Sequence, residues 1–240
     1  MEKSDTGKPK RYPTGGELDY RSLANKYLEG YNNALLTALA PVDIEGFVAD
    51  YLQLNILNAT MKLPFVKGFI VYMQMYFDTD VSSCRISVDP GTIILNTDLN
   101  QNAIAKRYVL AHEAGHWILN REKPCDTHSY YSCCKSFLKR ADLLDAEKVK
   151  DYFDHEPDAW SETRADSMAN ALLMPAGAFT PLATELMGQH GLHTHRMIVG
   201  ECPDVENTII QELAAIFVVP EFAVRNYLYT LGMYENSNCG

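Results

Sequence analysis

Long apolar runs and positive charge are both scarce in this 240-residue chain. No stretch approaches the roughly 18 uninterrupted apolar residues of a membrane span, and the most apolar one, GFIVYMQMYF, is broken by Gln74. The chain has 21 Lys and Arg against 31 Asp and Glu, which gives a formal net charge of −10. We therefore expect no membrane segment and no direct nucleic-acid binding, because nucleic-acid binders normally present a basic patch.

The chain also lacks a disulfide framework and a secretion signal. Six cysteines in a chain of this length do not make a disulfide scaffold. Residues 1–20, MEKSDTGKPKRYPTGGELDY, contain no apolar core of the kind that a signal peptide needs. These features predict a cytoplasmic protein. Three cysteines lie near His128 at a spacing that matches no usual zinc-finger pattern, so we interpret them as free thiols rather than a second metal site: Cys125, Cys133 and Cys134.

The apolar periodicity predicts an α+β fold that is mainly helical and carries a small, mostly antiparallel sheet. We expect a flexible tail over residues 1–16, a helical extension over 17–40, the main domain over 41–200 and a helical segment over 201–240. PVDIEGFVADYLQLNI predicts a helix with Asp43 as its N-cap. Short β-branched runs follow, and Pro90-Gly91 predicts a hairpin turn between CRISVD and TIILNT.

Three further helical segments are predicted towards the C-terminus. One runs over about residues 101–120, and a second, AWSETRADSMANALLM, ends where Pro175 disfavours helical backbone at the preceding residue. IIQELAAIFVVPEFAVRNYLYTLGM predicts two short helices with a turn near Val219-Pro220. Residues 176–208 show no clear pattern, and HGLHTH within them is interpreted as a loop.

The stretch RYVLAHEAGHWIL, residues 107–119, carries two histidines four residues apart. This spacing places His112 and His116 on one helix face, where both can bind one metal ion. Glu113 is rotated by about 100° around the helix, which suits a general base that takes a proton from a metal-activated water attacking a carbonyl. The alternative is a buried helix whose histidines bond to backbone carbonyls. Gly115 predicts that another chain segment approaches this helix closely, because glycine costs about 1 kcal/mol there.

A catalytic zinc needs three protein ligands and one open position. WSETRADSMANALLMP offers Glu162 as the third ligand, and Asp166, one turn later, as an acceptor for the free ring N–H of a ligating histidine. The small Ala165 and Ala169 allow this helix to approach the first. Other residues remain candidates for the third ligand: His128, Asp154, His155, Glu156, Asp158, His190, His193 and His195. A histidine of HGLHTH, Tyr130 or Tyr131 is a candidate for stabilising the oxyanion.

These segments together resemble the ImmA/IrrE family of metallopeptidases, roughly from Pro41 to Pro175 and more weakly to Met233. RYVLAHEAGHWIL is similar to the family's arginine-led catalytic helix, and ETRADSMANALLMP resembles its glutamate-containing helix. PVDIEGFVADYLQLNI resembles the opening helix, while LPFVKGFIV and TIILNT fall where the sheet is expected. The resemblance implies a zincin-like domain over 41–200.

The resemblance also assigns roles to residues. It implies that His112, His116 and Glu162 bind Zn²⁺ and that Glu113 is the general base. The family usually has a second Glu and an Asn where this chain has Arg164 and Asp166. Asp166 brings the chain closer to the Glu-zincin arrangement of thermolysin-like enzymes. The linker between Trp117 and Glu162 is also longer than in compact members.

The implied function is a cytoplasmic zinc endopeptidase that cleaves a specific protein, a helix-turn-helix repressor. TIILNT is a hypothetical shelf on which an extended peptide adds as a further strand. The alternative function is a non-catalytic regulatory or binding protein with a structural metal or none. The C-terminal stretch also resembles a degenerate helix-turn-helix, but it is poor in Lys and Arg, so we expect packing or partner docking there rather than DNA binding.

Overall fold

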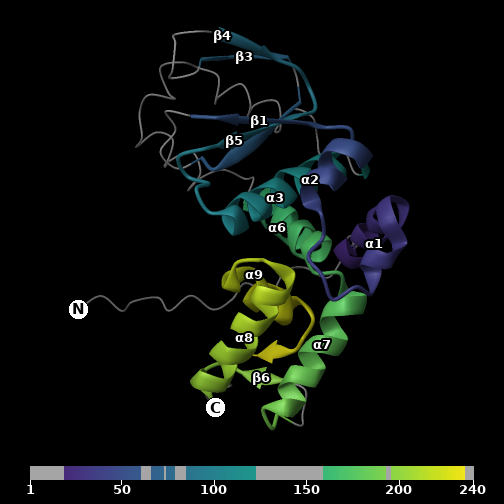
Figure 1. Cartoon of the computed structure of the whole chain (residues 1–240), viewed down its shortest axis with the longest axis vertical. Helices are drawn as coiled ribbons and strands as arrows, with labels where there is room; N and C mark the ends of the chain where they lie inside the picture. The colour runs from purple at the N-terminus through teal and green to yellow at the C-terminus, as the bar shows by residue number, and fades with distance from the viewer. Residues whose placement is uncertain are drawn as a thin grey trace, which may run out of the picture.

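The computed structural model describes residues 19–60, 66–72, 74–78, 85–122, 159–192 and 196–235. The tail over 1–16, the cysteines near His128 and the histidines at 193 and 195 lie outside these ranges. The strands β1, β3, β4 and β5 lie at one end of the molecule and α7, α8 and β6 at the other, with α3 and α6 between them (Figure 1). The predicted mainly helical α+β fold is confirmed.

A small mixed sheet has the strand order β1-β5-β2. β5 (Thr92–Asn96) pairs in parallel with β1 (Asn55–Ala59) and antiparallel with β2 (Gly68–Val71). All five residues of β5 are buried, which fits a central strand. β2 is therefore an edge strand of the described sheet.

The predicted hairpin around Pro90-Gly91 is wrong. β4 (Arg85–Val88) pairs antiparallel with β3 (Met75–Asp78) in a separate two-stranded sheet, whereas β5 pairs with β1 and β2. The turn residues were interpreted correctly as a turn, and Gly91 takes φ +80°, which favours glycine. A turn signal gives no information about which strands pair on either side of it, so the turn here joins two sheets.

The N-terminal helices pack beside the central pair of helices. α1 (Tyr20–Asn32) begins after Asp19, whose carboxylate accepts the backbone N–H groups of Arg21 and Ser22. A 3₁₀ turn, η1 (Asn33–Leu36), follows. Asp43 is the predicted N-cap and accepts the N–H of Gly46, but the helix it begins is short: α2 (Ile44–Gly46) continues as the π-helical turn η2 (Phe47–Tyr51).

The two central helices are α3 (Ala103–Glu122) and α6 (Ala159–Leu173), close to the predicted bounds. They pack closely at Gly115, where a Cβ atom would lie 3.0 Å from the carbonyl oxygen of Ala165 and 3.2 Å from Cβ of Met168. The close approach predicted from Gly115 is thus confirmed, and Ala165 is the residue opposite it.

Three helices form the C-terminal end. α7 (Ala176–Gln189) was not predicted, although its buried residues follow a helical stripe, because Gly177, Pro181 and Gly188 interrupt the pattern. α8 (Pro203–Phe217) and α9 (Glu221–Thr230) are the two predicted helices, joined at Val218–Pro220. The short strands β6 (Met197–Ile198) and β7 (Tyr234–Glu235) pair in parallel. Buried residues from α1, β5, α3, α6, α7, α8 and α9 belong to one hydrophobic core.

No single helix of the described ranges is long and apolar enough to cross a membrane. α8 and α9 pass that test only as a pair, and they are bent by 104° at the break between them.

Candidate metal centre

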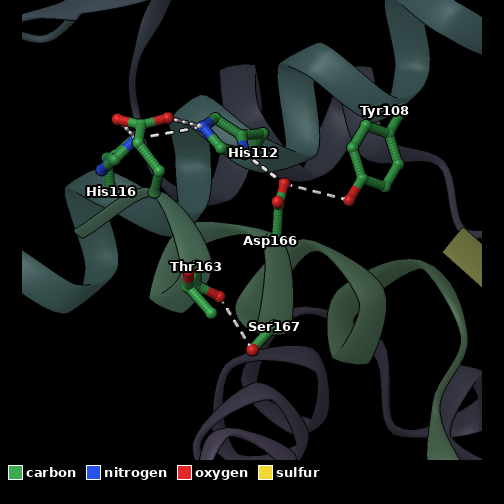
Figure 2. Close-up of polar contacts among 7 residues, drawn as sticks. Tyr108, His112, His116, Thr163, Asp166 and Ser167 are labelled. Carbon is green, nitrogen blue, oxygen red and sulfur yellow. Dashed lines mark hydrogen bonds and ion pairs between the residues drawn. The ribbon is translucent and has the colours of Figure 1, made fainter. Parts of the chain in front are cut away.

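One face of α3 meets one face of α6 in a ladder of polar side chains (Figure 2). α3 contributes Tyr108, His112 and His116, which are spaced four residues apart and so share a face. α6 contributes Glu162 and Asp166, also four residues apart. His116 lies opposite Glu162 and Tyr108 lies opposite Asp166, so the two helices run in opposite directions along the ladder.

Three ligand atoms converge at one end of this ladder. Nε2 of His112 lies 3.1 Å from Nε2 of His116 and 3.1 Å from Oε2 of Glu162. Nε2 of His116 lies 3.3 Å from Oε1 of Glu162. These atoms form a group that could hold a metal ion, with ligand atoms within 4.8 Å of one another.

Asp166 fixes the orientation of His112. Its Oδ1 lies 2.9 Å from Nδ1 of His112 and also accepts a hydrogen bond from the hydroxyl of Tyr108 at 3.1 Å. Because an ionised carboxylate only accepts hydrogen bonds, the proton of the imidazole lies on Nδ1. Nε2 is then the ring atom directed towards His116 and Glu162, and its lone pair is available to a metal ion once Nε2 has lost its proton.

The charges of the cluster depend on one another. Burial lowers the pKa of His112, but hydrogen bonds to Asp166 and Glu162 outweigh burial and raise it to about 10. Burial raises the pKa of Glu162, but its hydrogen bonds to His112 and His116 outweigh burial and hold that pKa below its ordinary value. The arrangement thus favours a positive charge between two imidazole nitrogens and a carboxylate.

Glu113 lies next to the ligands, but its surroundings differ. The side chain is buried, and the backbone N–H of Ile70 in β2 donates a hydrogen bond to it. Burial raises the pKa of this carboxyl, which the positive field of His112 and His116 opposes. A carboxylate with a raised pKa, held by the edge strand beside the ligands, is suited to taking up a proton.

The side chains present fit a divalent metal. Two neutral imidazole nitrogens and one carboxylate oxygen form a His₂Glu set, which is a donor set of catalytic zinc sites. Nε2 of His112, Nε2 of His116 and the carboxylate of Glu162 converge within hydrogen-bonding distance, so a divalent ion bound among them could take one lone pair from each once the ring nitrogens are deprotonated. An ordinary helix with histidines bonded to backbone carbonyls would not bring them together in this way.

Of the alternative third ligands, only His190 lies within the described residues, and it lies at the end of α7 rather than in this cluster. His190 caps the end of α7, and its Nε2 lies 4.0 Å from Oε1 of Glu212. The remaining candidates for the third ligand, at 128, 154–156, 158, 193 and 195, and the two tyrosine candidates for the oxyanion, at 130 and 131, lie outside the described residues.

Two participants were missed in the sequence. Tyr108 is not among the site residues predicted from the sequence, although its position four residues before His112 places it on the same helix face, beside Asp166. Ile70 could not have been found, because its contribution is a backbone N–H whose direction depends on strand pairing.

The sequence model of the IrrE N-terminal-like domain, a peptidase family, matches residues 73–229. The chain belongs to this family. No curated protein and no solved structure gives a significant match. The IrrE-like match confirms the resemblance inferred from the motifs, and it includes α3, α6 and most of the C-terminal helices, whereas β1 and β2 precede it. Membership of the IrrE-like family together with the His112, His116 and Glu162 cluster indicates a metallopeptidase.

Proposed function

We propose that this chain is a zinc-dependent endopeptidase that hydrolyses a peptide bond in a specific protein substrate, a helix-turn-helix repressor. The observation that supports hydrolysis most directly is the position of Glu113. It is buried, it lies beside three convergent ligand atoms, and it is held by an edge strand. A structural metal site would need the ligands but not this carboxylate.

His112, His116 and Glu162 would hold the zinc ion. Zinc bound there supplies a Lewis acid for the scissile carbonyl and lowers the pKa of a water molecule to about 7. Asp166 keeps the proton of His112 on Nδ1, so that Nε2 remains a donor of its lone pair. Exposure of half the Glu162 side chain leaves the site accessible from solvent.

Glu113 would move the proton in both halves of the reaction. It takes a proton from the attacking water as the water oxygen bonds to the carbonyl carbon. It then delivers that proton to the nitrogen as the C–N bond breaks, so that the amine leaves in neutral form. Burial raises the pKa of Glu113, which favours its taking up a proton from water.

The strand in TIILNT, which the sequence predicts as the substrate-binding strand, cannot pair with a substrate. TIILNT contains β5, which is paired on both sides and has no free edge. No strand of the described ranges pairs with the other edge of β2. Asn96 donates to the carbonyl of Lys67 directly opposite, so in the alternating antiparallel pattern the backbone groups of Gly68 and Ile70 face away from β5. The N–H of Ile70 accordingly reaches Glu113.

We infer that an extended substrate segment pairs with the part of this edge of β2 that Glu113 leaves open, where the backbone groups of Gly68 face away from β5. The edge passes beside Glu113 on α3, so a paired peptide would run past the ligand cluster. Main-chain hydrogen bonds would then align the scissile carbonyl with the water that Glu113 activates.

The test is cleavage and metal content of Glu113→Gln beside the unchanged protein. We expect about one zinc per chain in both, and cleavage of the helix-turn-helix repressor encoded nearest its gene by the unchanged protein only. Glu185→Gln is the matched control, since this carboxylate lies exposed on α7, and it should cleave normally. Equal cleavage by Glu113→Gln would exclude the mechanism.

The second candidate is a non-catalytic regulatory or binding protein that keeps the same scaffold. It predicts zinc binding without hydrolysis and tight capture of the repressor by both the unchanged protein and Glu113→Gln. The position of Glu113 favours the enzyme, because binding alone requires no buried carboxylate beside the ligands.

Direct nucleic-acid binding is not part of the proposal. The segment from Pro203 to Thr230 contains α8 and α9, and its only Lys or Arg is Arg225. Arg225 is bonded to Glu206 and to the side-chain oxygen of Asn207. A helix pair without further positive charge is poorly suited to phosphate contacts, so these helices support a role in packing.

A further inference from the structure

We propose that Tyr108 is a positioning residue of the metal centre and that the C-terminal helix α9 holds it in place through Phe222. The inference rests on the proposed metal site and extends it by two contacts. It makes the C-terminal helices part of the support of the metal centre.

The first contact is the hydroxyl of Tyr108. It donates to Oδ1 of Asp166, the same oxygen that lies 2.9 Å from Nδ1 of His112. A carboxylate that accepts from two fixed donors on one helix has its rotation restricted. Asp166 itself is 43% exposed, so α6 alone does not enclose it. Without Tyr108 the carboxylate would be free to turn towards water, and His112 would lose its orienting partner.

The second contact is between aromatic rings. Phe222, in the first turn of α9, lies edge-on to Tyr108 with ring centroids 4.9 Å apart. Phe222 is 50% exposed, whereas Tyr108 is 7% exposed. The exposed ring therefore covers a buried one, and such an edge-to-face contact fixes the ring that carries the hydroxyl.

The preceding residue is held by the same part of the chain. Nε of Arg107 donates to the backbone carbonyl of Val218, in the α8–α9 connection, at 3.3 Å. Val218 adopts φ 54°, a left-handed conformation that is unfavourable for a β-branched residue. Two successive residues of α3 thus contact the α8–α9 connection and the start of α9, one turn before the first ligand.

Three successive contacts connect α9 to the metal ligand His112. Phe222 packs on Tyr108, Tyr108 donates to Asp166, and Asp166 orients His112. The first link runs from α9 to α3, the second from α3 to α6, and the third from α6 back to α3. Metal affinity should therefore depend on residues that never touch the metal.

The experiment measures Zn²⁺ affinity by competition with a chromophoric chelator. Tyr108→Phe keeps the ring and removes only the hydroxyl. Outer partners of metal ligands typically contribute about 10–100-fold in affinity, so this more distant group should contribute roughly 3–10-fold. The matched control is Tyr227→Phe, since the Tyr227 hydroxyl is buried on α9 without a hydrogen-bond partner among the described residues. That variant should bind zinc as the unchanged protein does.

Phe222→Ala tests the contact with α9. It should weaken zinc binding in the same direction, whereas Leu39→Ala, which removes a large exposed side chain elsewhere, should not. In an Asp166→Ala background, Tyr108→Phe should have no further effect on affinity, because its hydroxyl acts through the carboxylate. The thermal midpoint of each metal-free variant separates this role from a general loss of stability, which would lower the midpoint and leave zinc affinity unchanged.

The outcomes distinguish this inference from the proposed function. Normal zinc affinity in Tyr108→Phe, or an equal loss with and without Asp166, would overturn the positioning role while leaving the metallopeptidase intact. Failure of the unchanged protein to bind zinc would overturn both. A loss confined to Tyr108→Phe and Phe222→Ala, and absent from the two controls, is the result we expect.

Discussion

At the scale of single residues, the site depends on positions where one atom decides the geometry. Gly115 is the clearest structural example, because its missing Cβ lets the carbonyl of Ala165 approach α3. The ligands of α3 and α6 converge only if the helices remain this close. A residue that contributes no chemistry is thus needed to bring the chemical groups together.

Gly115→Ala should destabilise the protein by about 1 kcal/mol. A Cβ 3.0 Å from a backbone oxygen forces the helices apart, and overpacking of this kind costs about 1–3 kcal/mol. The higher helix propensity of alanine offsets about 1 kcal/mol of this overpacking cost. Urea unfolding of the metal-free protein measures the difference.

Gly188→Ala is the matched control for that substitution. Gly188 also lies in a helix, α7, but nothing lies within 4 Å of the position of its Cβ. It should stabilise by about 0.5–1 kcal/mol through propensity alone. Stabilisation by both substitutions would show that the helices can separate freely at Gly115.

Glu206 supplies a pH-dependent contribution to stability away from the metal centre. Burial raises the pKa of this carboxyl, but hydrogen bonds from Tyr234, the N–H of Gly200 and Arg225 outweigh burial and hold it below its ordinary value of 4.5. The contribution is therefore complete above pH 4.5 and is lost as pH falls through the lower pKa of the folded protein.

Glu206→Gln should accordingly be less stable than the unchanged protein at pH 7, by about 2 kcal/mol, the scale of a hydrogen bond to a charged group. The difference should shrink in urea titrations near pH 3. A difference that stays constant between these pH values would show that Glu206 is not held as a carboxylate by these partners.

At the scale of elements, the proposed position of the substrate depends on the edge of β2. The sequence correctly predicts β5 as a strand. A short apolar run does not reveal that all five of its residues are buried. Pairing order is a property of the folded sheet. The sequence therefore favours TIILNT, the strand nearest α3 in sequence, as the substrate-binding strand, whereas the strand order of the folded sheet leads us to propose β2.

Pairing of a substrate with β2 predicts an alternating pattern. Once the cleavage site is mapped, a peptide of that sequence can be N-methylated at one backbone nitrogen at a time. Cleavage should fall at every second position, since only alternate N–H groups of a paired strand point towards its neighbour. Uniform tolerance of methylation along the peptide would contradict strand pairing.

At the scale of the whole molecule, the central helices were the most predictable part. Two histidines at i and i+4, and a Glu and an Asp at the same spacing, define two helix faces that need no tertiary information. Their mutual contact could be inferred from Gly115 and Ala165. The contact of Phe222 with Tyr108 could not, because it joins residues 114 positions apart whose proximity depends on how α8 and α9 fold back onto α3.

The predicted boundary before residue 201 also depends on contacts between residues that are distant in the sequence. Residues 201–240 were separated from the main domain on sequence texture, yet α8 and α9 contribute buried residues to the same hydrophobic core as α3 and α6. The chain bends by 104° between them, at the left-handed Val218, and α9 contacts α3 through Phe222 and Tyr108. The local composition of a chain does not predict which helices pack against each other in the folded protein.

The central claim is that His112, His116 and Glu162 bind one metal ion. X-ray absorption at the zinc edge of the zinc-loaded full chain tests it most directly. We predict two imidazole nitrogens at about 2.0–2.1 Å and carboxylate oxygen at about 2.0–2.2 Å, lost together in a His112→Ala, His116→Ala double variant. Sulfur neighbours at about 2.3 Å, retained in that variant, would place the metal on cysteines such as Cys125, Cys133 and Cys134 and contradict the account.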